Sequence, residues 1–349
     1  MPIMIRFTRL LPAAVLLAAG VTAPATARDL TVVSWGGAYQ DAQREIYFEP
    51  FKATGVPMHD ESWDGGIGVL RAKVEGGDSS WDVVQVESEE LALGCEEGLF
   101  EPLNWDAIGG RDAYLPEAVN DCGVGTIVYN NVLAYDGAKF PDGPKSWADF
   151  WDVQKFPGKR AMRQGPKINL EAALMADGVA PADVYKVLAT PEGVDRAFRK
   201  LDELKPNLIW WTAGAQPPQM LASGEVAMTT AYNGRIAAAN VADKKDFRVV
   251  WNGSLFTIDS WVILKGSPNV DAATKFLAFV GKPENQAKLP TKIAYGVTNK
   301  AATPLIPAEY LPGLPTNPDN MSQAVELNAE FWLENIDSLT ERFNTWAAK

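Results

Sequence analysis

The sequence is poor in the residues that most catalytic and metal sites require. Its 349 residues contain one histidine, His59, and two cysteines, Cys95 and Cys122. A single histidine excludes a histidine-rich metal cluster, and no nucleophile motif stands near it to make a serine–histidine triad. No phosphate-binding loop, dinucleotide-binding fingerprint or nucleophile elbow is present either. We therefore expect no catalytic residue, no metal and no cofactor.

Long hydrophobic runs are equally scarce, and the one of note stands at the N-terminus. Arg6 and Arg9 precede the apolar run 10–19, and the small residues at positions 25 and 27 form a cleavage pattern. Because the run is too short to cross a bilayer, the pattern predicts a signal peptide over residues 1–27 rather than a membrane anchor. The mature chain is then secreted and begins at Arg28.

Basic residues are outnumbered in this chain. It has 32 lysines and arginines against 44 aspartates and glutamates, for a formal net charge of −12. Loss of residues 1–27, with their two arginines, takes this charge to −14. An acidic protein repels nucleic acid and attracts cations over long range, although such charge also serves solubility alone. We therefore expect no nucleic-acid partner, and the charge gives weak support for a cationic ligand.

The two cysteines suit one disulfide. In a secreted protein an even pair of cysteines is usually bonded. A bond between Cys95 and Cys122 closes a loop of about 26 residues and, through chain entropy, contributes about 3 kcal/mol. We predict a structural disulfide here rather than two free thiols.

Strand-like and helix-like segments alternate along the chain. The patterns give strands at 30–33, 81–86, 127–135, 161–163, 226–230 and 256–265, and helices at 38–48, 89–97, 192–204 and 271–280. This order predicts an α/β fold with a mostly parallel sheet and ligand-binding loops at the carboxyl ends of its strands. The roughly 322 mature residues are enough for two domains.

The segment 144–160 is the most distinctive in the sequence. It reads PKSWADFWDVQKFPGKR, which predicts a turn, a short helix with an aromatic face, a second turn and a strand. This segment resembles one found in the extracellular solute-binding proteins of ABC importers, in their spermidine/putrescine-binding branch. Weaker landmarks follow the family's order through nearly the whole mature chain, at 32–36, 81–84, 97–99, 128–130, 221–226, 232–234, 258–260, 271–277 and 295–299.

The resemblance implies a two-lobed periplasmic-binding-protein fold of type II, with a ligand cleft between lobes that are joined by hinge segments. Lobe one takes residues 28–134 plus 265–349, lobe two takes 135–264, and the hinge lies near 130–136 and 260–266. It further implies a periplasmic monomer that binds a small amine or amino-acid ligand and delivers it to the membrane permease of an ABC importer.

The resemblance also implies which residues bind the ligand. Carboxylates hold amines by charge, and aromatic faces attract them by cation–π interaction. Asp259 is the first candidate, because a carboxylate in its apolar strand is costly unless paired, and the family's matching aspartate holds the ligand amine. For Trp35, Tyr232 and Tyr295 core packing is the alternative. The predicted ligand-binding residues are Trp35, Gly36, Glu87, Ser88, Arg163, Asn169, Trp211, Tyr232, Arg235, Asp259, Tyr295 and Trp332, and Gly37, Thr212, Thr257 and the rest of 163–169 match pocket loops as well.

Three positions depart from the polyamine-binding pattern. Gly37 replaces an acidic residue, Thr257 replaces an aromatic one, and the stretch 163–169 is basic and neutral where polyamine binders carry carboxylates. A long diamine needs a carboxylate at each end, which Glu87 could restore. One acid and one cation instead suit a zwitterion, with its carboxylate held in an arginine fork. The cation would be Arg163, Lys167 or Arg235.

Several functions remain open from the sequence. The main hypothesis is a periplasmic receptor for a polyamine such as putrescine. Its alternative is a receptor for a zwitterionic ω-amino acid such as γ-aminobutyrate. An Fe(III) receptor and an enzyme are less favoured, since the chain lacks a Tyr-Tyr dipeptide and every catalytic motif considered.

Overall fold

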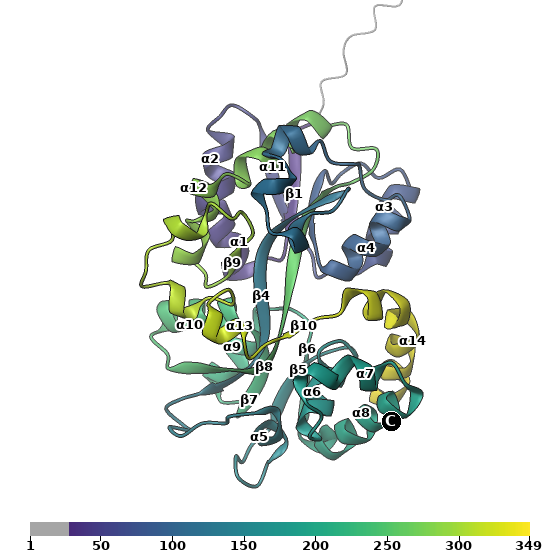
Figure 1. Cartoon of the computed structure of the whole chain (residues 1–349), viewed down its shortest axis with the longest axis vertical. Helices are drawn as coiled ribbons and strands as arrows, with labels where there is room; N and C mark the ends of the chain where they lie inside the picture. The colour runs from purple at the N-terminus through teal and green to yellow at the C-terminus, as the bar shows by residue number, and fades with distance from the viewer. Residues whose placement is uncertain (1–27) are drawn as a thin grey trace, which may run out of the picture.

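One sheet runs through two lobes of the molecule. The computed structural model describes residues 28–349, and the predicted signal peptide, residues 1–27, lies outside the described part. Within residues 28–349, ten strands form a sheet with the main order β2-β1-β3-β8-β4-β7-β5-β6, while β9 pairs with β4 and β10 with β8. In Figure 1 an upper and a lower lobe are joined by β4 and β8, which confirms the predicted two-lobed α/β fold.

The first lobe is built on parallel strands. β1 (Leu30–Ser34) is an apolar run buried along its whole length, and it pairs with β2 (Met58–Ser62) and β3 (Val83–Val86). A π-helical turn, Arg44–Phe48, follows α1, so the helix predicted over 38–48 changes pitch midway. The helices of this lobe are α1 (Gly37–Gln43), α2 (Glu49–Lys52), α3 (Ile67–Glu75), α4 (Ser88–Glu96), α11 (Val270–Val280) and α12 (Pro283–Gln286).

Two long strands connect the lobes. β4 (Gly123–Asp136) and β8 (Phe247–Ile263) pair with each other in antiparallel fashion. β8 pairs with β3 in the first lobe, and β4 pairs with β7 (Met228–Tyr232) in the second. The register of the β4–β8 pair shifts between Asn131 and Leu133, within the predicted hinge 130–136. Bending of the molecule at this point stays a prediction.

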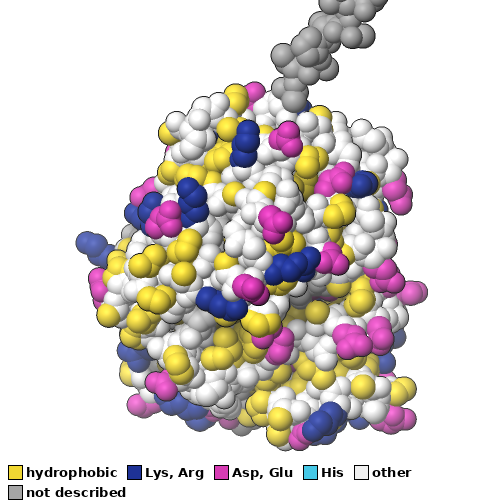
Figure 2. All heavy atoms as spheres, turned by 45° about the horizontal axis from the view of Figure 1, so that its top comes forward, with side chains coloured by type: hydrophobic (Ala, Val, Ile, Leu, Met, Phe, Trp, Pro, Cys, Tyr) yellow, Lys and Arg dark blue, Asp and Glu magenta, His cyan; other side chains and the backbone are white. Residues whose placement is uncertain are grey.

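The second lobe places helices around a smaller part of the sheet. β5 (Arg160–Arg163) lies between β6 (Leu208–Trp211) and β7, in parallel with both. The helices of this lobe are α5 (Trp147–Trp151), α6 (Asn169–Ala176), α7 (Val184–Leu188), α8 (Pro191–Leu204), α9 (Gln216–Ser223) and α10 (Asn233–Asp243). On the face seen in Figure 2, acidic and basic side chains are interspersed across both lobes.

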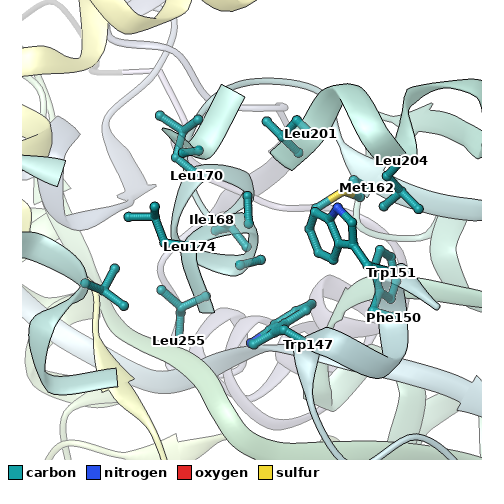
Figure 3. Packing of buried hydrophobic residues seen from close by; sticks show 14 of the residues in the cluster. Trp147, Phe150, Trp151, Met162, Ile168, Leu170, Leu174, Leu201, Leu204 and Leu255 are labelled. Carbon is teal, nitrogen blue, oxygen red and sulfur yellow. The ribbon is translucent and has the colours of Figure 1, made fainter. Parts of the chain in front are cut away.

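The distinctive segment 144–160 forms the predicted aromatic helix. Trp147, Phe150 and Trp151 of α5 are buried, and they pack in the core of the second lobe with Leu204 of α8 (Figure 3). The two indole nitrogens donate to the carbonyl oxygens of Gly253 and Lys200, each at 2.8 Å. The segment therefore fastens the loop after β4 to the body of the second lobe.

The C-terminal part of the chain crosses to the second lobe. The short elements β9 (Gly296–Val297), α13 (Pro318–Met321) and β10 (Val325–Glu326) lead to α14 (Ala329–Ala347). Phe343 and Trp346 of α14 pack against Trp210 of β6, and the helix lies beside α7 and α8 in Figure 1. The range 265–349, predicted for lobe one, is thus divided: α14 packs with lobe two because its apolar face completes that lobe's core.

A disulfide joins α4 to the start of β4. Cys95 and Cys122 are bonded, with their Cα atoms 6.0 Å apart. The bond ties a helix that leads into the interlobe region to one of the two connecting strands. Among residues 28–349, no helix combines the length and the apolar character needed to cross a membrane.

Candidate functional site

A pocket lies between the lobes, where β4 and β8 pass from one to the other. It contains about 470 Å³ of empty space, counting its opening to solvent. The lining residues come from both lobes and both connecting strands: Trp35, Tyr39, Trp63, Asp64, Glu87, Ile127, Tyr129, Arg163, Thr212, Gly214, Tyr232, Arg235, Asp259 and Tyr295.

Aromatic side chains form a large part of the pocket wall. Trp35 stacks on Trp63, with ring centroids 5.2 Å apart. Tyr129 meets Tyr232 and Tyr295 edge-on, at 5.4 and 6.1 Å. Burial raises the pKa of these tyrosines above the ordinary value, so their hydroxyl groups stay protonated. Such a wall offers aromatic faces and hydroxyl groups to an organic cation.

Asp259 of β8 is a buried carboxylate without a cation. Its residue is 3 % exposed, and the indole nitrogen of Trp35 donates to its Oδ2 at 2.7 Å. Its Oδ1 has no hydrogen-bond partner, and within residues 28–349 no lysine or arginine pairs with it. Burial, followed by the negative charge of Glu87, raises the pKa of Asp259 well above its usual range. A positively charged ligand group would stabilise the ionised carboxylate here.

Arg235 is the opposite case, a buried cation without a carboxylate. It stands in the first turn of α10 and is 4 % exposed. Its Nη1 donates to the carbonyl oxygen of Gly36 at 2.8 Å and its Nη2 to that of Trp35 at 3.1 Å. Nε is buried without a partner, and the described part of the chain contains no acidic side chain paired with this guanidinium. Arg235 is therefore held rigidly, with donor capacity to spare for a ligand carboxylate.

Gly37 makes room for Arg235. Its φ of +55° lies in the left-handed region that favours glycine. A Cβ atom built at this position would lie 2.9 Å from Nη1 of Arg235, which is closer than real contacts. The guanidinium thus occupies the space next to position 37 that a side chain would otherwise need.

Glu87 also lines the pocket, but two cations neutralise it. Nη1 of Arg163 lies 3.0 Å from its Oε1, and Nζ of Lys167 bonds both its Oε2 and Oε1 of Glu89. Burial opposes ionisation of Glu87, yet the charges of Arg163 and Lys167 hold its pKa well below the usual range. Because the acids lie on α4 and the cations on lobe two, this cluster also bridges the lobes.

Comparison with known proteins identifies the family. A family profile described as bacterial extracellular solute-binding protein matches residues 49–316. The chain belongs to this family. Its members bind solutes for ABC transporters, so this solute-binding protein is not an enzyme, in agreement with the expectation from its sequence.

Relatives of this solute-binding protein differ in what they bind. The chain is 48 % identical to the gamma-aminobutyric acid-binding protein of Pseudomonas aeruginosa, over 95 % of each chain. It superposes on the solved structure of a GABA receptor with a TM-score of 0.80 and 35 % identity, covering 92 % of this chain and 98 % of that one. Its identity to the putrescine-binding periplasmic protein PotF of Escherichia coli is 24 %, over 86 % of each chain.

The solute-binding protein brings most of the sequence-predicted residues together. Seven of the predicted ligand-binding residues line the pocket: Trp35, Glu87, Arg163, Tyr232, Arg235, Asp259 and Tyr295. Thr212, a loop match, lines it too. Gly36 contributes through its carbonyl oxygen, which holds Arg235. Their roles in binding stay predictions.

Besides Gly36, four predicted residues lie outside the pocket lining. Ser88 turns away, toward Thr257, whose hydroxyl donates to it at 3.2 Å. The Nδ2 of Asn169 closes its own loop by donating to the carbonyl oxygens of Arg163 and Gly165. Trp211 donates to Thr230 within a core cluster.

Trp332 is the fourth residue outside the lining. It lies in the core of lobe two, and its indole nitrogen donates to Oε1 of Glu171 at 2.7 Å. Trp211 and Trp332 thus fill cores, an alternative that the sequence raised for Trp35, Tyr232 and Tyr295 but not for these two.

Six lining residues were not predicted: Tyr39, Trp63, Asp64, Ile127, Tyr129 and Gly214. Tyr129 had a usable signal, since it lies in the strand landmark 128–130 beside the residues that cross between lobes. Trp63 follows an exposed strand and enters the pocket only by stacking on Trp35. That contact joins residues 28 positions apart on separate loops, so local pattern could not reveal it.

Proposed function

We propose that this protein is the periplasmic substrate-binding component of an ABC importer for γ-aminobutyrate or another short ω-amino acid. One observation carries the proposal. The same pocket contains a buried carboxylate without a cation, Asp259, and a buried guanidinium without a carboxylate, Arg235. A ligand with one ammonium and one carboxylate group neutralises both. The 48 % identity to a gamma-aminobutyric acid-binding protein supports this choice.

The ligand ammonium is assigned to Asp259. Oδ1 of Asp259 is the acceptor left without a partner, and the rings of Trp35 and Tyr129 belong to the same pocket wall. A charge-assisted hydrogen bond to this oxygen contributes about 1.5–3 kcal/mol, and each aromatic face adds on the order of 0.5–2 kcal/mol. The positive charge also removes the cost of leaving an ionised carboxylate buried.

The ligand carboxylate is assigned to Arg235. The two carbonyl bonds fix the plane of the guanidinium and leave Nε as an unused donor. Since the carbonyl oxygens belong to lobe one and Arg235 to lobe two, this contact exists only when the lobes are closed. Binding therefore couples to closure, which presents the closed form to the permease.

The polyamine hypothesis, preferred on sequence alone, loses support on two grounds. Its second acid, Glu87, is neutralised by Arg163 and Lys167. Moreover, identity to a putrescine-binding relative is 24 %, half of that to the gamma-aminobutyric acid-binding one. An iron receptor is disfavoured by the 48 % identity to a gamma-aminobutyric acid-binding protein.

Thermal melting with candidate ligands tests the proposal. A ligand that binds the folded state alone at a hundred times its Kd stabilises it by about 2.7 kcal/mol. We expect γ-aminobutyrate to raise the melting midpoint by several degrees, with smaller shifts for β-alanine and 5-aminovalerate, one methylene shorter and longer. A shift with putrescine that exceeds every ω-amino acid would overturn the assignment.

A further inference from the structure

Besides the exposed Asp64, the pocket contains two buried carboxylates, which is what a diamine receptor needs. Asp259 and Glu87 both line it, and the charge of Glu87 acts on Asp259. Each is less than one-tenth exposed. If neither carboxylate were paired with a protein cation, each ammonium group of a diamine could pair with one of them. The difference between them is that Glu87 already has cations and Asp259 has none.

We propose that Arg163 and Lys167 mask Glu87 and thereby make the pocket reject diamines. The inference rests on the proposed function, since it explains why a pocket with two buried acids would prefer a zwitterion. A second ligand ammonium near Glu87 would meet two protein cations already bonded to that carboxylate. It would have to displace them into a buried space or remain unpaired, and both are unfavourable.

The backbone around Lys167 is shaped to direct its side chain inward. Ile168 has a φ of +76°, which is a rare conformation for a β-branched residue. Asn169 closes the loop with bonds to the carbonyl oxygens of Arg163 and Gly165, at 2.6 and 2.7 Å. The side chain of Lys167 is 11 % exposed.

The two acids bonded by Lys167 have different positions. Glu87 lines the ligand pocket and Glu89 does not, although both acids line an adjoining hollow together with Lys167. The mask therefore acts through Glu87. This difference provides a matched pair of variants, Glu87→Gln and Glu89→Gln, that distinguishes exposure of a pocket acid from a general change of charge.

The test is a gain of diamine binding, measured by calorimetry with putrescine and cadaverine. We expect the double variant Arg163→Met/Lys167→Met to bind one of these diamines at least tenfold more tightly than the unaltered protein. Adding Glu87→Gln should abolish the gain, and adding Glu89→Gln should leave most of it. Lys186→Met, which changes an exposed lysine on α7, is the control and should bind as the unaltered protein does.

The outcomes separate this inference from the proposed function. No gain in a folded double variant, or a gain that survives Glu87→Gln, would overturn the mask. If the double variant does not fold, Lys167→Met alone must show a smaller gain, and its absence would overturn the mask equally. Failure of the unaltered protein to bind any ω-amino acid would contradict the proposed function. The mask is tested separately, by the gain of diamine binding in the double variant.

Discussion

Replacing Asp259 with asparagine separates charge from shape in the proposed ammonium site. The variant keeps the volume of the side chain and an oxygen that can accept from Nε1 of Trp35. It loses the negative charge, so a bond contributing about 1.5–3 kcal/mol disappears and affinity for γ-aminobutyrate should fall about 10- to 100-fold. Calorimetric titration at pH 7 measures this loss.

The same substitution should stabilise the unliganded protein. The folded pKa of Asp259 is raised by burial and by Glu87. The protonated side chain of Asp259 therefore contributes fully to the unfolding free energy below its pKa in the unfolded chain. This contribution is lost as pH rises through its raised pKa in the folded protein. Asparagine does not ionise, so the melting midpoint of Asp259→Asn should exceed that of the unaltered protein by an amount that grows with pH.

Two results would refute this reasoning. One is unchanged affinity in Asp259→Asn, which would remove the residue from the ligand site altogether. The other is a variant that is less stable than the unaltered protein at every pH, which would make Asp259 a structural carboxylate. Asp142→Asn, at an exposed position in the turn that follows β4, is the control and should change neither quantity.

The remaining predictions concern the carboxylate site and stability. Arg235→Gln should weaken γ-aminobutyrate binding about 10- to 100-fold by calorimetry, because a charge-assisted bond is lost; equal affinity would exclude it as the carboxylate site. Cys95→Ala/Cys122→Ala should lower the unfolding free energy by about 3 kcal/mol in urea titrations, and no loss would mean that the bond carries no stability. Asp82 is fully buried, and Arg28 donates to it at 2.6 Å. The substitution Asp82→Ala should lower the unfolding free energy by about 2–3 kcal/mol, which is less than for a fully buried ion pair because Arg28 is partly exposed. A loss of unfolding free energy below about 1 kcal/mol would contradict this prediction.

The sequence was sufficient for the features that depend on local pattern. The alternation of strands and helices predicts the α/β lobes, and the spacing of Trp147, Phe150 and Trp151 predicts their common burial in α5. The expectation at Asp259 also depends on local pattern, since a carboxylate in an apolar strand requires a partner. The structure places it, without a cation, in the pocket lining.

The features that pattern could not reveal depend on contacts between distant segments. Trp211 and Trp332 carry the same residue type as the pocket residue Trp35, and only their surroundings show that they belong to cores. Likewise, the charge of Glu87 is neutralised by Lys167, 80 positions along the chain. A sequence shows that both charges are present but not that they meet.

The central claim is that the pocket binds a zwitterion through one acid and one guanidinium. Calorimetric titration of the unaltered protein with γ-aminobutyrate, butylamine, butyrate and putrescine tests it most directly, because butylamine and butyrate each carry one of the two charged groups. The account predicts that γ-aminobutyrate binds at a single site, at least a hundredfold more tightly than each of the other three. Butylamine or putrescine binding as tightly as γ-aminobutyrate would contradict it, since the guanidinium would then contribute nothing to recognition.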